Sequence, residues 1–500
     1  MELYIGLFIF AFIMMACLLS SKFSSYINMP SLLLFLAVGM LFGSEGIGGI
    51  DFDNATVANY IGSAAMAFIL FSGGFDTNWK NVRSVFLTGG ILSSIGVLLT
   101  ALFTGFFVWF FLKFATPNSE VPLSWCILLG SIISSTDAAA VFSILRSRSV
   151  SLRGNLQPLL EFESGSNDPM AAFLTVFMVD VVVSEMATGV SMPLKDYWVI
   201  LPFFVWKMAL GIGFGCFLGW LAVWIYNKIN FEYSGLYYVL GIIMVLFSFS
   251  LTELSQGNGF MAVYVCGMFM GNHRFIYHNS IGRFYDGLAW IMQVVLFTML
   301  GLLAFPTQIW HAKWIGLVIA LFLMVVARPL AVFISMWRSR FSVTERLLVS
   351  WVGLRGGAPI MLATFPLMAN IPNSDLLFHV VFFIVLTSVL IQGMTIMPMA
   401  KMLKLDAPLR KNPMAPLFIE ETGDENSTSR EITVPAAWNG EQLAKLQLPK
   451  EALVVLIRRD DKFILPRGDV ALLEDDVLTV MGTPAAIQFA VDKLYGSGLN

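Results

Sequence analysis

Charged residues are scarce in this sequence. Asp, Glu, Lys and Arg make up only 13% of its 500 residues, whereas a soluble chain carries about a quarter. Hydrophobic residues make up 57%, and the mean hydropathy is +0.77. The apolar residues come in runs about as long as the ~20 residues that a bilayer-crossing helix needs. The scarcity of charge therefore excludes a soluble globular protein and predicts an all-α polytopic membrane protein.

Cysteine and histidine are also scarce, with four of each. All the cysteines fall inside apolar runs, where a thiol behaves as a small buried hydrophobe: Cys17, Cys126, Cys216 and Cys266. Disulfides and a Cys/His site for a transition metal are therefore not expected. The N-terminus lacks a basic region followed by a cleavage site, so we expect its first apolar run to be a retained helix.

Thirteen apolar runs are candidate membrane spans, the second of them short enough to suggest a broken element. They lie near 3–20, 30–43, 56–75, 84–113, 122–145, 155–183, 196–227, 233–253, 256–272, 284–305, 310–335, 346–370 and 376–398. The even-numbered loops between them carry three basic residues, Lys113, Lys195 and Lys313. The odd-numbered loops and the segment after the last span carry sixteen: Lys22, Lys80, Arg83, Arg146, Arg148, Arg153, Lys228, Arg274, Arg283, Arg338, Arg340, Arg346, Lys401, Lys404, Arg410 and Lys411. The positive-inside rule then predicts an N-terminus outside the cell and a C-terminus in the cytoplasm.

The spans divide into two units, spans one to six and eight to thirteen. Because one span separates them, the second unit enters the membrane from the opposite side, as in the inverted repeats of secondary transporters. The fifth element of each unit is a poor continuous helix. "GLRGGAP" in span twelve has the helix breakers Gly353, Gly356, Gly357 and Pro359. "SSTDAAA" in span five has hydroxyl side chains that can bond to the local backbone, Ser134, Ser135 and Thr136. We therefore expect discontinuous helices five and twelve.

The character of the sequence changes after the membrane domain, which we place at 1–400. Residues 401–430 are polar and contain proline, as is typical of a linker. Residues 431–500 contain the β-like runs "EITVP", "ALVVLIRR", "KFILP" and "VLTVMG", with two helix candidates, "NGEQLAKLQL" and "PAAIQFAVDKLY". These runs predict a small cytoplasmic α+β domain that is marginal alone and dimeric.

Polar side chains lie at membrane depth in spans five and six. An ionised carboxylate there costs about 2.5–3.5 kcal/mol even on mild insertion scales, so such residues are functional candidates. Asp168 lies near the midplane, on one helix face with Ser164 and Asn167. Together with Asp137 and the loosened backbone at Thr136, they offer hard oxygen ligands for Na⁺ or K⁺. A purely structural role for Asp137, paired with an arginine or a backbone amide, stays open.

Glu163 is expected to be structural, because a buried carboxylate needs a cation. Arg328 in span eleven and Arg355 in span twelve lie at a similar depth, and depth does not choose between them. Glu161 is nearer the interface and is expected to be solvated. Lys207 lies within span seven without an evident partner.

These motifs together resemble a known family. "STDAAAV" followed by "ESGSNDP" looks like the signature of the NhaP-like monovalent cation/proton antiporters, and "ARPLAV" and "GLRGGAP" match further positions of that family. The resemblance covers the membrane domain. The stretch "VVLIRRDDKFILPRGDVALLEDDVLTVMG" is similar to the C-terminal regulatory domain of the TrkA-C (RCK-C) type. The combination looks most like the bacterial potassium/proton antiporter branch.

The resemblance implies roles for individual residues. The carboxylate that takes cation and proton in competition would be Asp168, and the residues that assist it would be Asn167, Ser164, Thr136 and Asp137. Glu163 would bridge to Arg328. Many relatives have proline after the span-five aspartate, where this chain has Ala138, so the break must depend on its hydroxyl residues and on packing.

The resemblance also implies a mechanism and a setting. A protonated and a cation-bound Asp168 are both neutral, so both can cross a low-dielectric pathway, and Asn167 in place of a second acid favours electroneutral exchange. Spans four to six and eleven to thirteen would move against the rest. We expect a homodimer in the bacterial inner membrane, regulated by an unidentified small ligand of nucleotide type, with no nucleic-acid partner. Relatives often continue into a further cytoplasmic module, so we expect a shortened chain.

Three rival functions compete with this interpretation. A regulated potassium channel should have a carbonyl-lined filter of the TVGYG kind, and the sequence has none. An intramembrane enzyme is not expected, because Asp137 and Asp168 lack the repeated context of two equivalent acids. A sodium/proton exchanger is the nearest alternative, since oxygen ligands serve both ions.

Overall fold

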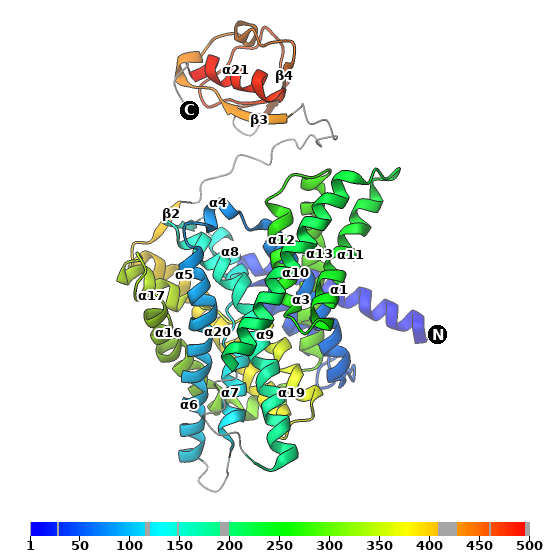
Figure 1. Cartoon of the computed structure of the whole chain (residues 1–500), viewed down its shortest axis with the longest axis vertical. Helices are drawn as coiled ribbons and strands as arrows, with labels where there is room; N and C mark the ends of the chain where they lie inside the picture. Colours follow the sequence, from blue (N-terminus) through cyan, green and yellow to red (C-terminus); the bar gives the residue numbers. More distant parts are fainter. Residues whose placement is uncertain are drawn as a thin grey trace. The chain divides into compact units, whose positions relative to one another are not determined.

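The computed structural model describes residues 2–27, 30–115, 121–147, 150–190, 200–408, 428–459 and 462–495 (Figure 1). They fall into two compact units, Met1–Arg274 with Gly282–Leu409, and Phe275–Ile281 with Arg410–Asn500. Each unit has a hydrophobic core of its own.

The first unit is a helical membrane domain. In the described part of the chain, nine helices are long and apolar enough to cross a bilayer. They are α1 (Glu2–Ile27), α3 (Ala55–Asp76), α5–α6 (Phe86–Ile91 and Val97–Ala115, joined by the π-helical turn Leu92–Gly96), α9 (Leu156–Thr188), α10 (Ile200–Lys228), α11 (Gly235–Leu254), α13 (His278–Leu302), α15–α16 (Lys313–Phe322 and Arg328–Ser335, joined by the π-helical turn Leu323–Ala327) and α20 (Ser374–Met402).

Shorter apolar helices occupy the predicted second, fifth, ninth and twelfth spans. They are α2 (Ser31–Phe42), α7 (Leu123–Ile132), α12 (Gly259–Gly271) and α18–α19 (Gly357–Leu362 and Thr364–Met368). The remaining helices of this unit are α4 (Trp79–Val82), α8 (Ala138–Ser147), α14 (Pro306–His311) and α17 (Val343–Trp351).

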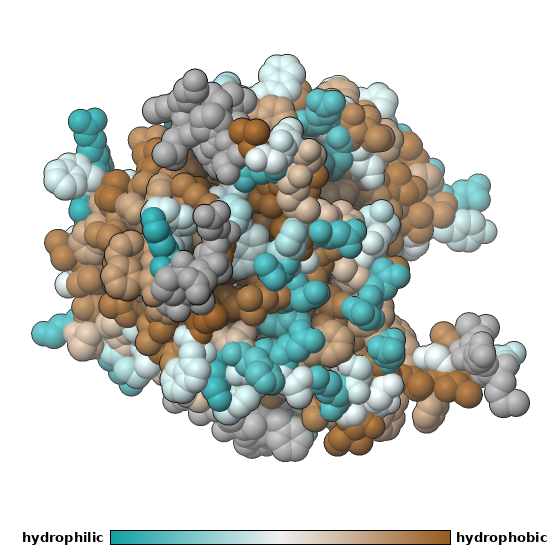
Figure 2. All heavy atoms as spheres, turned by 90° about the horizontal axis from the view of Figure 1, so that it is seen from below, coloured by the Kyte–Doolittle hydropathy of each residue, from teal (hydrophilic) through white to brown (hydrophobic). Residues whose placement is uncertain are grey.

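Large apolar side chains stay exposed on the outer faces of the long helices. Phe8 on α1, Trp206 on α10 and Leu254 on α11 are 71%, 60% and 84% exposed. Figure 2 shows hydrophobic residues over much of the sides of the molecule, with hydrophilic residues gathered on the face toward the viewer. Exposed apolar surface on this scale fits a protein whose solvent is lipid.

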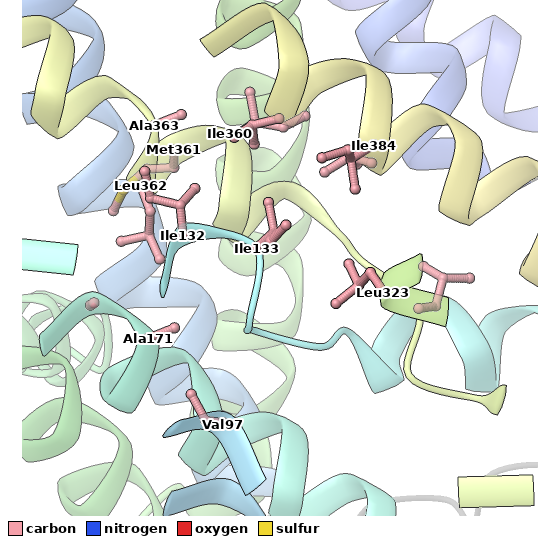
Figure 3. Packing of buried hydrophobic residues seen from close by; sticks show 14 of the residues in the cluster. Val97, Ile132, Ile133, Ala171, Leu323, Ile360, Met361, Leu362, Ala363 and Ile384 are labelled. Atoms are coloured by element: carbon pink, nitrogen blue, oxygen red, sulfur yellow. The ribbon is translucent and has the colours of Figure 1, made fainter. Parts of the chain in front are cut away.

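Both predicted breaks are present. Helix α7 ends at Ile132 and α8 begins at Ala138, while α17 ends at Trp351 and α18 begins at Gly357. Figure 3 shows Ile132 and Ile133, at the end of α7, near Ile360, Met361 and Leu362 of α18, and these two helices are in contact. The two interruptions therefore meet in the core of the membrane unit.

The short strand β1 (Val150–Leu152) pairs antiparallel with β2 (Asp406–Pro408). Strand β2 and the last residues of α20, which ends at Met402, lie within the stretch predicted as a linker. Residues 401–408 are therefore part of the membrane unit. Residues 409–427 of the predicted linker lie outside the described part. The β1–β2 pair follows from contacts between distant segments, which local patterning does not reveal.

The small domain has a four-stranded antiparallel sheet in the order β3–β6–β4–β5. Its elements are β3 (Thr428–Thr433), β4 (Ala452–Arg459), β5 (Lys462–Ile464), β6 (Val477–Gly482) and α21 (Pro484–Tyr495). The helix predicted over "NGEQLAKLQL" is wrong, since only one 3₁₀ turn forms there, at Leu443–Leu446, with another just before it at Ala436–Trp438. The backbone N–H groups of Leu443 and Ala444 donate to Val470 O and Gly468 O instead of to a helix.

Helix α12 packs between α3 and α10, and glycines make both contacts close. A Cβ on Gly267 or Gly271 of α12 would lie 2.3 or 1.9 Å from a backbone oxygen of α3. A Cβ on Gly215 of α10 would lie 2.6 Å from Ala262 O of α12. Gly215 belongs to a row at i, i+4 spacing, Gly211, Gly215 and Gly219, which is typical of close helix packing in membranes.

We predict that Gly215→Ala lowers the apparent melting temperature of the detergent-solubilised protein. The new methyl group must push α10 away from α12, at a cost of about 1–3 kcal/mol. The control is Gly213→Ala, two residues away on the same helix, where a Cβ meets nothing within 4 Å. The control should be neutral or slightly stabilising because alanine favours helix. Equal melting temperatures for the two variants would contradict this account of the packing.

Candidate cation-binding site at two interrupted helices

The candidate site lies where the break at 133–137, the middle of α9 and the break at 352–356 come together. Helix α9 contacts α7, α8 and α18, and α18 also contacts α7. Helix α9 carries the sequence "ESGSNDP", including Pro169, within a single 33-residue helix. One long helix therefore supplies the acidic side chains, and the two breaks supply exposed backbone groups beside them.

Hydrogen bonds join the two breaks directly. The Asp137 N–H donates to Leu354 O at 2.7 Å. The Arg355 side chain donates through Nη1 to Ser134 O at 2.7 Å and to Ser135 O at 2.5 Å. These carbonyls, released by the end of α7, would otherwise be unsatisfied in the protein interior. Arg355 is 1% exposed, so its charge is used within the core.

Asp168 is bound by a residue of the first break. Its Oδ1 accepts a hydrogen bond from Ser135 Oγ. Asp168, Asp137 and Ser164 all line one cavity of about 470 Å³. The cavity has further acidic residues in its wall, Asp76 of α3, Glu161 of α9 and Asp286 of α13. The cavity thus brings carboxylate oxygens from three helices and the first break to one space.

Ser164 ties the first break to α9 while facing the cavity. Its hydroxyl donates to Thr136 O at 3.1 Å and accepts from the Ala138 N–H at 3.0 Å. The Ala138 N–H, which a proline at this position would lack, thereby fixes the start of α8. Ser164 and Asp168, four residues apart, share the cavity-lining face of α9.

Asn167 and Thr136 lie behind the cavity. Asn167 Nδ2 donates to Thr136 Oγ1, and Thr136 Oγ1 donates to Glu163 Oε1 at 3.4 Å. Neither residue lines the cavity, and they are 0% and 4% exposed. Asn167 Oδ1 is buried without a hydrogen-bond partner among the described residues. In this conformation both side chains support the break, and the hydroxyl of Thr136 is already engaged.

Glu163 pairs with Arg328, not with Arg355. Arg328 Nη2 lies 2.6 Å from Glu163 Oε1, and the two side chains are 1% and 2% exposed. Arg328 Nε and Nη1 have no hydrogen-bond partner within the described part of the chain. A Cβ on Gly353 would lie 2.7 Å from Arg328 Nε, so glycine leaves room for the guanidinium.

Sequence reasoning missed several members of the site. The sequence indicates Ser135 only as a possible helix breaker, because spacing does not give the direction of a hydroxyl in a non-helical stretch. Asp76 and Asp286 come from helices far apart in the chain, and Glu161 was expected to be solvated outside the site. Lys207 lies outside the cavity lining, with Nζ 5.1 Å from the centre of the Phe203 ring.

This arrangement offers the chemistry needed to bind and release a small cation. Carboxylates and hydroxyls are hard oxygen ligands, and discontinuous helices crossing beside an acidic residue are the usual construction of secondary-transporter sites. The fold and the site together define a membrane transporter of small cations.

Comparison with known proteins gives the family. The family described as "Sodium/hydrogen exchanger, transmembrane" matches residues 8–402, and the TrkA-C domain matches residues 428–494. The chain belongs to the sodium/hydrogen exchanger family and has a C-terminal TrkA-C domain. It is a cation/proton antiporter of the NhaP type.

Several curated proteins are similar over most of their length. The "K(+)/H(+) antiporter NhaP" of Alkalimonas amylolytica is 36% identical over 93% of this chain and 79% of its own. The "K(+)/H(+) antiporter NhaP2" of Shewanella sp. (strain ANA-3) is 35% identical over 95% of this chain and 81% of its own. The "Na(+)/H(+) antiporter NhaP" of Pseudomonas aeruginosa is 26% identical over 80% of this chain and 98% of its own.

A solved structure has the same membrane fold. The sodium proton antiporter MjNhaP1 from Methanocaldococcus jannaschii at pH 8 superposes with a TM-score of 0.68, at 24% identity, over 81% of this chain and 99% of that one. At this identity the likeness supports the fold alone.

We predict that Glu163→Ala strongly destabilises the membrane unit. The substitution leaves Arg328 buried without its carboxylate, which costs about 3–5 kcal/mol. The measurement is the apparent melting temperature in detergent, with Glu232→Ala, at an exposed loop position, as the control. The double variant Glu163→Leu/Arg328→Met removes both charges and should recover most of the stability. If Glu163→Ala melted like the control, the pair would not stabilise the fold.

Proposed function

We propose that this protein exchanges cytoplasmic K⁺ for external H⁺ by competition at Asp168. The observation that carries the proposal is the position of Asp168 in the cavity wall, together with Asp137 and Ser164. One carboxylate can take either a proton or a cation, and neighbouring oxygens can complete the coordination of the cation. Two similar proteins are named K⁺/H⁺ antiporters, which supports K⁺ as the transported ion.

The exchange is electroneutral in this proposal. An empty, ionised Asp168 is costly in a low-dielectric pathway, whereas its protonated and cation-bound forms are neutral. Only the two loaded forms then cross, one ion for one proton. The neighbouring position is Asn167, whose amide cannot ionise, so no second charge is carried on that residue.

Alternating access in this proposal uses two inverted six-helix repeats within thirteen spans. Corresponding irregularities support the repeats. The short apolar helices, α2, α7, α12 and α18–α19, are the second and fifth elements of each unit. The π-helical turns Leu92–Gly96 and Leu323–Ala327 interrupt the fourth element of each unit, and each turn contacts the other unit's fourth element. The bundle α5–α9 with α15–α20 would move against the other helices.

The setting of the protein is also part of the proposal. The distribution of Lys and Arg supports an inner-membrane protein with its N-terminus outside and its C-terminal domain in the cytoplasm. The cavity, which reaches Pro30–Leu32 and the end of α3 at Asp76 and Thr77, would then open toward the cytoplasm. The protein would be a homodimer, and the TrkA-C domain would regulate exchange through a small ligand of nucleotide type.

A sodium/proton antiporter is the second candidate. The similar protein of Pseudomonas aeruginosa is named a Na⁺/H⁺ antiporter. Carboxylate and hydroxyl oxygens coordinate Na⁺ as well as K⁺, so the two candidates share one site and one mechanism and differ in the ion that fits.

We predict that Asp168→Asn abolishes cation-driven proton movement, because the amide can neither take up a proton nor balance the charge of a cation. The measurement is dequenching of a pH-sensitive dye in everted membrane vesicles on addition of K⁺, Na⁺ or Li⁺. Asp180→Asn, on the same helix but outside the cavity lining, is the matched control and should stay active.

The outcomes of this test separate the candidates. A response to K⁺ in the wild type and the control, absent in Asp168→Asn, supports the proposal. A response to Na⁺ alone supports a sodium/proton antiporter that works by the same mechanism. Transport that survives in Asp168→Asn contradicts competition at this carboxylate.

A further inference from the structure

We infer that Ser135 is a positioning residue for the exchange. Its hydroxyl holds Asp168 as the carboxylate and so sets the pH at which the proton gives way to the cation. This inference deepens the proposed function and rests on it.

The contact is specific to one of two neighbouring serines. Ser134 and Ser135 are both 0% exposed, and both backbone carbonyls accept from Arg355. The hydroxyl of Ser134 donates back to Ser131 O at 2.6 Å, whereas the hydroxyl of Ser135 donates to Asp168 Oδ1. Among the described residues, Ser135 is thus the hydrogen-bond donor to the Asp168 carboxylate.

Ser135 is held in place from the other break. It lies outside any helix, so the helical backbone does not fix it. Arg355 binds its carbonyl, and the Arg355 N–H donates to Ser388 Oγ of α20 at 3.1 Å. Ser388 Oγ donates to Gln392 Oε1 at 2.5 Å, and Gln392 Nε2 donates to Trp351 O at 2.8 Å. A chain of hydrogen bonds thus runs from α17 and α20 through Arg355 and Ser135 to Asp168.

The hydroxyl favours the ionised carboxylate. A serine can donate to a carboxylate or accept from a carboxylic acid, but a hydrogen bond to a charged partner is about twice as strong as a neutral one. Removing the hydroxyl therefore makes Asp168 hold its proton to a higher pH. Loss of one such bond corresponds to about a tenfold change in the competition between proton and cation, or about one pH unit.

Other charged groups also face Asp168, and the substitution leaves them in place. Those that share the cavity are Asp137 of the first break, Asp76 of α3, Glu161 of α9 and Asp286 of α13. Those behind it are Glu163 of α9, Arg328 of α16 and Arg355 of the second break. Because Ser135→Ala changes none of these charges, a shift in the pH profile reports the hydroxyl alone.

The experiment compares Ser135→Ala with Ser134→Ala, the same chemical change one residue earlier. Dye dequenching in everted vesicles is recorded over a series of pH values and K⁺ concentrations, or with Na⁺ if the wild type responds only to Na⁺. For Ser135→Ala we expect a profile moved about one unit toward alkaline pH. At near-neutral pH the half-saturating cation concentration should rise about tenfold, while the maximal response at alkaline pH is retained. For Ser134→Ala we expect the wild-type profile.

A second readout does not require turnover. Proton release from the purified protein on addition of the same cation, measured against pH, should show the same alkaline shift in Ser135→Ala. Profiles that coincide for the two serine variants in an active protein would overturn the role of Ser135 and leave the exchange itself standing. A Ser135→Ala protein that is folded but inactive at every pH would also overturn it, because the hydroxyl would then do more than position Asp168. A wild type that neither releases protons nor transports them with any of the three cations would overturn the proposed function.

Discussion

The membrane unit depends on the hydrogen bonds that tie its two broken helices to each other. A helix that stops inside a bilayer leaves carbonyls and N–H groups without partners, and each such group costs several kcal/mol in hydrocarbon. Here each break satisfies the other, through Asp137 N–H to Leu354 O and through Arg355 to Ser134 O and Ser135 O. These mutual hydrogen bonds allow two stretches of non-helical backbone to lie in the core of the membrane unit.

The same arrangement explains why the buried charges are tolerated. Glu163 neutralises Arg328 at 2.6 Å, and carbonyl oxygens at the end of α7 stabilise Arg355. Ser164 of α9 adds two bonds to the first break, because its hydroxyl donates to Thr136 O and accepts from the Ala138 N–H. These bonds hold the break although position 138 is an alanine and not a helix-breaking proline.

Much of this organisation could be predicted from the sequence. Long apolar runs located the membrane helices, and the glycines and proline of "GLRGGAP" and the hydroxyls of "SSTDAAA" indicated the two breaks. What could not be predicted depends on side-chain direction and on contacts between distant segments. Spacing placed Asn167 beside Ser164 and Asp168, yet its side chain turns to Thr136, behind the cavity. Asp76 and Asp286 reach the cavity only through the packing of α3 and α13.

The two arginines nearest to the site have other partners, and this leaves Asp168 available. Among the residues that the structure describes, no basic side chain forms an ion pair with Asp168. A guanidinium at that carboxylate would hold it ionised and remove the need for any mobile partner. Arg328 is paired with Glu163, and Arg355 binds backbone carbonyls. In the proposed mechanism the charge that compensates Asp168 would then come from an ion that can enter and leave. The fixed pairs around the site therefore support the proposal that exchange takes place at Asp168.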